Sequence, residues 1–466
     1  VVVRHGDVLA SQDAALTLQS PKPGWSEQDP VAWIAATCAA VHGALAAAGK
    51  DARDVAGISL SGQMHGAVML DATDNPVRPC ILWNDNRSVA QCAELSRGVP
   101  DIGYKAGIPP LPGFTAPKLM WVAQHDAAAF AQIKTILMPK DFIGLWLTGE
   151  KGTDYSDAAG TCWLNQADHA WDPKIIEASG IDPAWLPPLM HGFDRLGTVR
   201  GDVAQQLGLS AACPVFAGGG DAATGALSLG AAHAGQCFMS LGTSGQLLTV
   251  DAQYQPNPDQ FVHAYCHTVP GTWYRMAAML NGARPLAWFA GVLGCDVAHV
   301  LDQAAQANPD RVPVFLPYLT GERSPHGDPD VRGGFYGLED ATGQPEMCRA
   351  VVEAVCFMMR DALDSFGDTF QPNGPIPVIG GGSRSDLLLG WMADVLDMPV
   401  ARAEAGAGRA AFGAAILAEV GTGARTVQDM AFAPMLSQQF LPRANDHMAG
   451  RLVQYRDLYN RVRGGL

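Results

Sequence analysis

The sequence predicts an α/β fold made of two duplicated domains, residues 1–232 and 233–466. Short apolar strands alternate with segments of helical periodicity, which is typical of sheets covered by helices. A buried strand, a triple-glycine turn and a helix occur twice, at residues 215–229 and 377–396. The length of 466 residues allows two or three domains, each with its own core.

The composition describes a folded, acidic protein. Hydrophobic residues make up 48% of the chain and charged residues 17%, so a disordered chain is excluded. The net charge of −15 repels phosphate backbones and anionic lipids, and we expect neither nucleic acid nor membrane as a partner. The negative charge does not exclude small anions as ligands, because backbone N–H groups of glycine-rich turns bind phosphate without basic side chains.

The cysteines indicate a reducing compartment. All ten lie in apolar segments without a C-x-x-C pair, which predicts free thiols in a cytoplasmic protein. No continuous apolar run reaches the length of about 18 residues that a membrane span needs, and no signal peptide is recognisable.

The chain opens on a predicted hairpin, with strands at residues 1–3 and 8–10 around a tight turn. A chain rarely starts inside a hairpin, so we expect further residues upstream of Val1. The next elements are helices, predicted from apolar spacing at residues 30–48, 118–132, 285–293, 346–366 and 452–462. Two more strands, 236–241 and 246–250, flank a turn of small residues.

Three glycine-rich turns suggest a nucleotide site. They lie at residues 218–220, 242–245 and 380–382, and such turns let the backbone approach a phosphate or a base closely. None matches the P-loop or the G-x-G-x-x-G pattern in its proper context, which disfavours P-loop NTPases and Rossmann dehydrogenases. Each turn taken alone is also explained as a tight connection between strand and helix.

Asp221 closes the first glycine turn and begins the next helix. One explanation is purely structural: Asp221 caps the start of that helix and does nothing else. Its position beside the glycines also suits a base or a metal ligand, since a phosphotransferase needs a carboxylate to orient a hydroxyl and take its proton.

Polar residues in the first half suggest a polyol site. His65 follows a strand in the segment 61–66, and Trp83, Asp85 and Arg87 combine an aromatic platform with hydrogen-bonding groups. Two structural explanations compete with this. His65 could be a satisfied structural residue, and Asp85 could cap a helix while Arg87 forms an ion pair with it.

Two longer motifs resemble the FGGY family of carbohydrate kinases. The first is at residues 113–122 and the second at residues 333–353, one in each half. The resemblance covers essentially the whole chain. It is strongest to members that act on D-xylulose, through stretches at residues 25–30, 62–66, 82–85, 139–141 and 317–326.

The resemblance implies two ribonuclease H-like domains of the actin and hexokinase type with the active site between them. It also implies ATP- and Mg²⁺-dependent phosphorylation of D-xylulose at its 5-hydroxyl. Asp221 matches the family's catalytic base, close to Mg²⁺ held on the phosphates, and Met64 and His65 match its sugar-contacting pair. Trp83, Asp85 and Arg87 fall in a segment lining the same side. The matches on the nucleotide side are Gly242, Thr243 and Ser244 in the phosphate hairpin, Gly380, Gly381, Gly382 and Ser383 against adenine and ribose, and more weakly Gly282.

Two departures from the family pattern leave alternatives open. Ala222 stands where these kinases usually carry a sugar-contacting Asn, so another ketose or a polyol, for example ribulose, is a second candidate substrate. The family's first phosphate loop, Asp-x-Gly-Thr, is expected upstream of Val1; without it, a non-catalytic actin-like nucleotide or sugar sensor is the alternative. The family often forms homodimers, which makes a second copy a possible partner.

Overall fold

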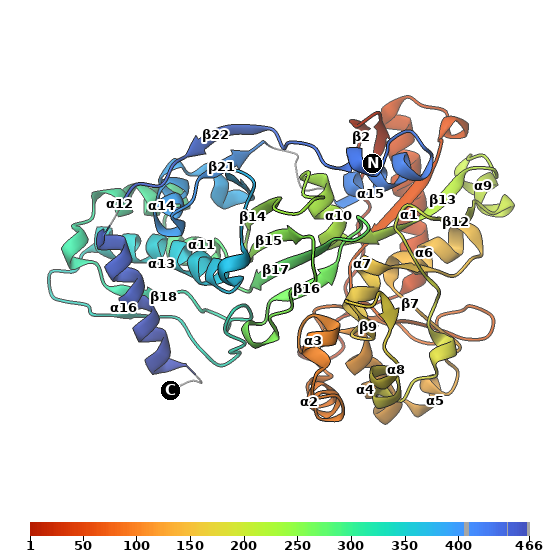
Figure 1. Cartoon of the computed structure of the whole chain (residues 1–466), viewed down its shortest axis with the longest axis horizontal. Coiled ribbons are helices and arrows are strands. Elements are labelled where there is room, and N and C mark those ends of the chain that lie inside the picture. Colours follow the sequence, from red (N-terminus) through yellow and green to blue (C-terminus); the bar gives the residue numbers. More distant parts are fainter. Residues whose placement is uncertain (405–409, 445, 464–466) are drawn as a thin grey trace.

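The computed structural model describes residues 1–404, 410–444 and 446–463. The chain forms two lobes that lie side by side, each with a β-sheet and covering helices (Figure 1). The amino-terminal half forms one lobe, and most of the carboxyl-terminal half forms the other.

The sheet of the amino-terminal lobe has the order β12-β13-β4. Strand β13 (Pro214–Gly220) pairs in parallel with β4 (Ile58–Gly62) and antiparallel with β12 (Arg195–Thr198). The glycines at 218–220, which the sequence assigns to a turn, belong to β13 itself. A Cβ at Gly218 would lie 1.9 Å from the Leu60 carbonyl oxygen, so glycine is needed there for the two backbones to approach.

The other lobe contains a seven-stranded mixed sheet, in which the second predicted hairpin is confirmed as β14 and β15. In sheet order its strands are β16 (His263–Cys266), β17 (Trp273–Met279), β15 (Gly245–Asp251), β14 (Cys237–Leu241), β20 (Ile376–Ile379), β21 (Val400–Ala403) and β22 (Leu436–Phe440).

The remaining strands form short pairs, and the predicted opening hairpin is confirmed as the first of them. The pairs are β1 (Val2–Arg4) with β2 (Asp7–Ala10), β3 (Glu27–Gln28) with β6 (Cys80–Ile81), β5 (Val68–Leu70) with β7 (Thr135–Leu137), β8 (Thr153–Asp154) with β11 (Leu189–Met190), β9 (Leu164–Asn165) with β10 (Ala170–Trp171), and β18 (Val314–Leu316) with β19 (Gly334–Tyr336).

Helices cover both sheets. Those in the first 210 residues are α1 (Pro30–Ala48), α2 (Val89–Gly98), α3 (Ile102–Ala106), α4 (Thr115–His125), α5 (Ala127–Phe130), α6 (Pro139–Thr148), α7 (Tyr155–Ala158), α8 (Pro173–Ser179) and α9 (Gly201–Leu207). Those that follow are α10 (Asp221–Ser228), α11 (Arg284–Leu293), α12 (Val297–Gln306), α13 (Gln344–Asp364), α14 (Asp386–Leu396), α15 (Ala410–Gly421) and α16 (Asp446–Val462).

The predicted helices are confirmed with two changes. The segment 118–132 is two helices, α4 and α5, because Asp126 leaves helical geometry and its side chain caps the second one at Ala129. The last helix, α16, begins six residues before the predicted start at Leu452.

Helix α15 makes the division at residue 232 less simple than the sequence suggests. It follows the second sheet in the chain, yet it packs on β4, β13 and α10 in the amino-terminal lobe (Figure 1). Gly413 lies against the backbone of Thr224 in α10, where a Cβ would be 1.9 Å from the Thr224 carbonyl oxygen. Part of the segment 233–466 therefore helps to build the amino-terminal lobe.

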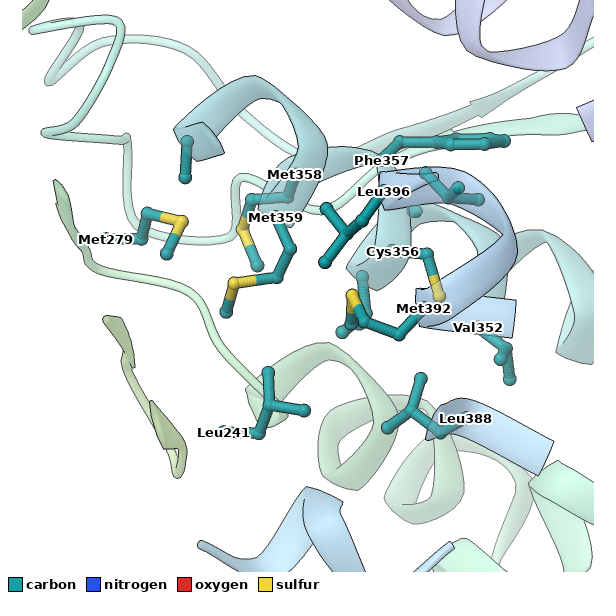
Figure 2. Close-up of a cluster of buried hydrophobic side chains, with 14 of the residues drawn as sticks. Leu241, Met279, Val352, Cys356, Phe357, Met358, Met359, Leu388, Met392 and Leu396 are labelled. Carbon is teal, nitrogen blue, oxygen red and sulfur yellow. The ribbon is translucent and has the colours of Figure 1, made fainter. Parts of the chain in front are cut away.

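Two large cores stabilise the molecule. One lies inside the carboxyl-terminal lobe, where Met279, Met358, Met359 and Met392 pack with Leu241 between α13, α14 and the sheet (Figure 2). The other contains residues from both halves of the chain, with helices of the amino-terminal lobe packed on β15, β16 and β17. The two lobes are thus joined by a shared apolar core.

The ten cysteines are all free, and only Cys295 is partly exposed. Helix α1 differs from expectation, because it is apolar and long enough to span a membrane by length and composition. It is rich in alanine and packs through Trp33, Cys38 and Leu45 on its own lobe. These contacts are those of a helix that covers a folded domain.

Candidate active site

Asp221 is the first residue of α10 and directly follows the glycine-rich end of β13. The carboxylate is accessible to solvent, yet it is surrounded by protein atoms, and this burial raises its pKa to about 6. The N–H groups of Asp221 and Ala222 oppose the rise. The structure therefore provides an accessible carboxylate that is ionised at neutral pH and basic enough to accept a proton.

Met64 packs on the glycine that precedes Asp221, and His65 packs on Gly160. A Cβ at Gly220 would lie 2.9 Å from the Met64 Cγ, and one at Gly160 would lie 2.7 Å from the His65 Nδ1. The glycine before Asp221 thus makes room for Met64. His65 stacks on Phe114, with 4.4 Å between the ring centroids.

The imidazole of His65 is held in one tautomer. Its Nδ1 lies 2.7 Å from the Gly160 carbonyl oxygen, which can only accept, so Nδ1 carries the proton and Nε2 is an acceptor. Burial lowers the His65 pKa to about 3, so the ring is neutral. The backbone has a φ of 70°, and the Lys118 Nζ and Thr115 Oγ1 both donate to the His65 carbonyl oxygen. Sequence reasoning missed this use of Lys118, although it lies in the first family motif.

Asp85 and Arg87 occupy a buried ion pair. The Asp85 carboxylate accepts from the Arg87 guanidinium at 2.6 and 2.8 Å and from the Ser26 N–H at 2.6 Å. Arg87 also pairs with Glu27 and lies over Trp25. This arrangement matches the ion pair of the structural alternative, and both side chains are engaged in holding the segment.

Trp83 is 54% exposed, and its backbone lies against Gly113, where a Cβ would be 1.9 Å from the Trp83 carbonyl oxygen. Gly113 precedes Phe114, which stacks on His65. The Trp83 backbone is therefore held near the His65–Phe114 stack, while the role of the exposed indole as a sugar platform stays a prediction.

The predicted nucleotide-side residues converge on one turn. Gly242, Thr243 and Ser244 join β14 to β15, and the two side chains are exposed. The Gly282 N–H donates to the Thr243 carbonyl oxygen at 3.0 Å, and a Cβ at Gly282 would lie 2.3 Å from the Ser244 carbonyl oxygen. Gly282 therefore packs directly on the hairpin.

The turn after β20 lies on the other side of the same hairpin. Gly380 has a φ of 92°, and a Cβ there would lie 2.7 Å from the Leu241 carbonyl oxygen. Gly381 faces open space, whereas Gly382 packs on Leu241. The Ser383 hydroxyl donates to the Gly380 carbonyl oxygen at 2.8 Å and so closes this turn.

A buried charge cluster behind Asp221 was not found from the sequence. The Lys140 Nζ lies 2.5 Å from Asp141, 2.9 Å from Asp154 and 3.5 Å from Asp157. Asp154 accepts from the Ser156 hydroxyl, which in turn accepts from the Gly220 N–H at 3.0 Å. The cluster therefore supports the backbone on which Asp221 stands. The only signal in the sequence was the motif at residues 139–141.

Within this cluster, Asp157 is the carboxyl group whose charged form is most clearly disfavoured by burial. Burial raises its pKa well above the usual range, and the carboxylates of Asp141, Asp154 and Asp221 add to the rise while Lys140 opposes it. Within residues 1–404, 410–444 and 446–463, neither oxygen of Asp157 has a hydrogen-bond partner.

Comparisons with known proteins identify the family of the chain. Residues 1–228 match the amino-terminal domain of the FGGY family of carbohydrate kinases, and residues 237–422 match its carboxyl-terminal domain. A xylulose kinase of Escherichia coli strain K12 is 38% identical over 98% of this chain and 95% of its own length.

Solved structures extend the comparison. A kinase from Brucella ovis, titled a "xyloylose kinase", is 38% identical with a TM-score of 0.91 over 96% of this chain and 93% of its own. A gluconate kinase from Lactobacillus acidophilus is 25% identical with a TM-score of 0.89 over 96% and 92% of the two chains. The likeness includes both lobes, so the two-domain fold of the actin and hexokinase type is confirmed. The chain belongs to the FGGY family of carbohydrate kinases.

Proposed function

We propose that this protein transfers the γ-phosphoryl group of ATP to the 5-hydroxyl of D-xylulose. The observation that carries the proposal is Asp221, an accessible and partly desolvated carboxylate that directly follows the end of a glycine-rich strand, where Gly220 packs on Met64. The xylulose kinases among the relatives support the choice of sugar, since several are 33 to 39% identical over most of this chain.

Phosphoryl transfer needs positioning and charge stabilisation more than covalent help from the protein. Asp221 would orient the sugar hydroxyl and accept its proton as the new P–O bond forms. The His65 Nε2 would accept a hydrogen bond from another hydroxyl. The exposed hairpin at Gly242, Thr243 and Ser244 would hold the phosphates with backbone N–H and hydroxyl donors.

Mg²⁺ suits the donor set of this site. Among the described residues no cluster of three metal-ligating side chains is found, and Mg²⁺ in kinases is usually held by one or two carboxylates together with substrate phosphates. Asp221 is the carboxylate that would face such an ion. When bound, Mg²⁺ would neutralise charge on the transferring phosphoryl group.

ADP formation with and without D-xylulose tests the function. We expect Mg²⁺-ATP turnover to require the sugar, with D-xylulose 5-phosphate as product by mass spectrometry. A protein that binds ATP and the sugar yet forms no product would instead support the non-catalytic sensor.

Another ketose or a polyol, such as ribulose, is the second candidate, and Ala222 favours it. Alanine lacks the side-chain amide expected beside Asp221, so one sugar hydrogen bond is lost. We expect Ala222→Asn to raise the ratio of kcat/KM for D-xylulose over D-ribulose by about 5- to 10-fold, as one hydrogen bond allows. A panel of both ketoses and their alditols measures this, and an unchanged ratio would contradict our interpretation of Ala222.

The acid limb of the pH profile should report Asp221. Because burial raises its pKa to about 6, the carboxylate becomes protonated below pH 6 and can no longer accept the hydroxyl proton. We expect kcat/KM for the sugar, at saturating ATP, to fall about tenfold per pH unit below that point. A limb near pH 4 would show that Asp221 titrates as an ordinary surface carboxylate.

Gly282→Ala should weaken ATP binding selectively. The new Cβ would meet the Ser244 carbonyl oxygen at 2.3 Å, so the hairpin must shift. We expect KM for ATP to rise about tenfold or more, with KM for the sugar unchanged. Gly291→Ala is the matched control, because it lies in the next helix with no atom within 4 Å of the added Cβ. Equal effects of the two variants would contradict the role of Gly282.

We also infer that the protein works in the cytoplasm, where its ATP and sugar substrates and its free cysteines are both expected. A homodimer stays a proposal, and light scattering of the purified protein would measure it.

A further inference from the structure

Arg323 belongs to the carboxyl-terminal lobe and lies beside the end of β17. The Arg323 Nε donates to the Ala278 carbonyl oxygen at 2.9 Å, at the end of β17. The backbone N–H of Arg323 donates to the Glu322 carboxylate at 2.8 Å. The next residue, Ser324, is tied to the same strand, since its hydroxyl accepts from the Ala278 N–H at 3.1 Å and donates to the Phe261 carbonyl oxygen at 2.6 Å. The arm that carries the guanidinium is therefore fixed.

In the described part of the chain, the two terminal amino groups of the Arg323 guanidinium make no such hydrogen bond. No acceptor within the described ranges lies in hydrogen-bonding geometry to its two terminal amino groups, Nη1 and Nη2, and no carboxylate there pairs with Arg323. Burial lowers the pKa of Arg323, but an arginine stays charged even so. The residue is partly exposed, and Nη1 and Nη2 are not among the buried polar atoms that lack a partner, so both amino groups are open to solvent and to a ligand.

His263 lies near Arg323 beside β17, because Arg323 donates to the Ala278 carbonyl oxygen and the His263 Nδ1 is bonded to the Met276 carbonyl oxygen two residues earlier. Burial lowers the pKa of both His65 and His263, and the charge of Arg323 adds to the effect in each. Phe114 lies between the two rings, stacked on His65 and edge-on to His263 at 6.4 Å. The His263 Nδ1 lies 3.3 Å from the Met276 carbonyl oxygen, so like His65 it keeps its Nε2 as an acceptor.

A second unused donor lies next to them. The Tyr265 side chain is 1% exposed, and its hydroxyl has no hydrogen-bond partner in the part of the chain that the structure describes. Its ring meets His263 edge-on, with 5.5 Å between centroids. An orphaned hydroxyl and an open guanidinium at one place indicate a ligand that supplies acceptors.

A sugar hydroxyl both donates and accepts, so it can pair with the imidazole acceptors or with Asp221. A ketone oxygen can only accept, and it needs a donor. We propose that Arg323 donates from its terminal amino groups to the carbonyl oxygen of an open-chain 2-ketose and so determines the preference for ketoses. This inference rests on the proposed function and assigns one end of the substrate to a residue of the second lobe.

The consequence for specificity follows from the chemistry of the donors. A terminal N–H group can donate to the carbonyl oxygen, which accepts and has no hydrogen of its own. In an alditol, a hydroxyl replaces that oxygen, and its hydrogen must find an acceptor beside a cation. The pocket should therefore favour D-xylulose over xylitol.

Arg323→Met tests the inference by removing the charged donor. Arg323→Lys tests whether a different charged donor restores the preference for the ketose. We expect the methionine variant to raise KM for D-xylulose about 10- to 100-fold, the effect of a lost charged hydrogen bond, while KM for ATP stays constant. Its ratio of kcat/KM for D-xylulose over xylitol should fall at least tenfold. Lysine keeps a charged donor and should restore part of that ratio. Arg332→Met is the control, because Arg332 is exposed and, among the described residues, its side chain bonds to the nearby carbonyl oxygens of Pro329 and Val331.

The outcomes separate the two proposals. If the wild-type protein fails to phosphorylate D-xylulose, the proposed function is overturned. If it does so and Arg323→Met keeps both the KM and the ketose preference, only the role of Arg323 is overturned. Should Arg323→Met fail to fold, Arg323→Lys still decides: an unchanged ratio of D-xylulose to xylitol contradicts the inference, and a reduced ratio with unchanged KM for ATP supports it.

Discussion

Asp221→Ala should lower kcat at least about a hundredfold while the dissociation constant for D-xylulose changes less than about threefold. Removal of the carboxylate leaves the sugar hydroxyl without an acceptor for its proton, and proton transfer of this kind contributes about 10²- to 10⁴-fold. The sugar contacts assigned to Met64 and His65 stay in place, because both are held by atoms other than the Asp221 carboxylate. Coupled ADP release gives kcat, and calorimetry without nucleotide gives the affinity.

Asp221→Asn and Asp202→Asn are the companions of this experiment. Asparagine preserves the shape and the helix start but cannot take a proton, so it should be almost as inactive as alanine. Asp202 is an exposed carboxylate near the start of another helix of the same lobe, and its variant should keep full activity. Near-normal turnover by either Asp221 variant would remove this residue from the catalytic role.

The sequence predicted most elements because their patterns are local. The limits of α1 were predicted to the residue, since Asp29 caps its start and Gly49 ends it in the left-handed conformation. The glycines at 218–220 were misplaced in a turn because their cause is not local. They allow β13 to approach β4, whose partner residues lie more than 150 positions earlier in the chain.

The candidate site divides in the same way. The glycine turns at residues 242–245 and 380–382 were visible as local patterns, whereas Gly282 was proposed only from the family resemblance. Gly282 and Gly380 pack on one hairpin, and the nucleotide role of all these residues stays a prediction. Asp85 could not be assigned from its neighbours, since one of its partners, the Ser26 N–H, is 59 residues away. Lys140 was overlooked as a structural residue because a lysine is normally exposed.

Lys140→Met should strongly destabilise the amino-terminal lobe. The Nζ of Lys140 is fully buried among Asp141, Asp154 and Asp157, and its loss leaves three carboxylates without a countercharge. Breaking a buried pair costs about 3–5 kcal/mol. Lys151→Met is the matched control, because its pair with Asp74 is partly exposed and should contribute at most about 1 kcal/mol. Urea unfolding of both variants measures the difference.

The pH dependence distinguishes this charge effect from a simple packing defect. The pKa values of Asp141 and Asp157 are already raised in the folded protein, and without Lys140 they should rise further. A carboxyl group with a raised pKa costs stability above its unfolded pKa of about 4, where the unfolded chain ionises and the folded one resists. The destabilisation by Lys140→Met should therefore be larger at pH 8 than at pH 5.

Lys140→Met should also lower kcat, although Lys140 is buried and does not contact the substrate. Asp154 holds the Ser156 hydroxyl, which accepts from the Gly220 N–H just before Asp221. If the cluster rearranges, the carboxylate of Asp221 shifts, and a displacement of about 1 Å can cost a hundredfold in rate. Adding Asp157→Asn removes one of the unpaired charges and should recover part of both the stability and kcat. Lys140 would contribute by packing alone if Lys140→Met lost the same unfolding free energy, relative to the wild type, at pH 5 and at pH 8. The absence of any recovery in the double variant would show the same.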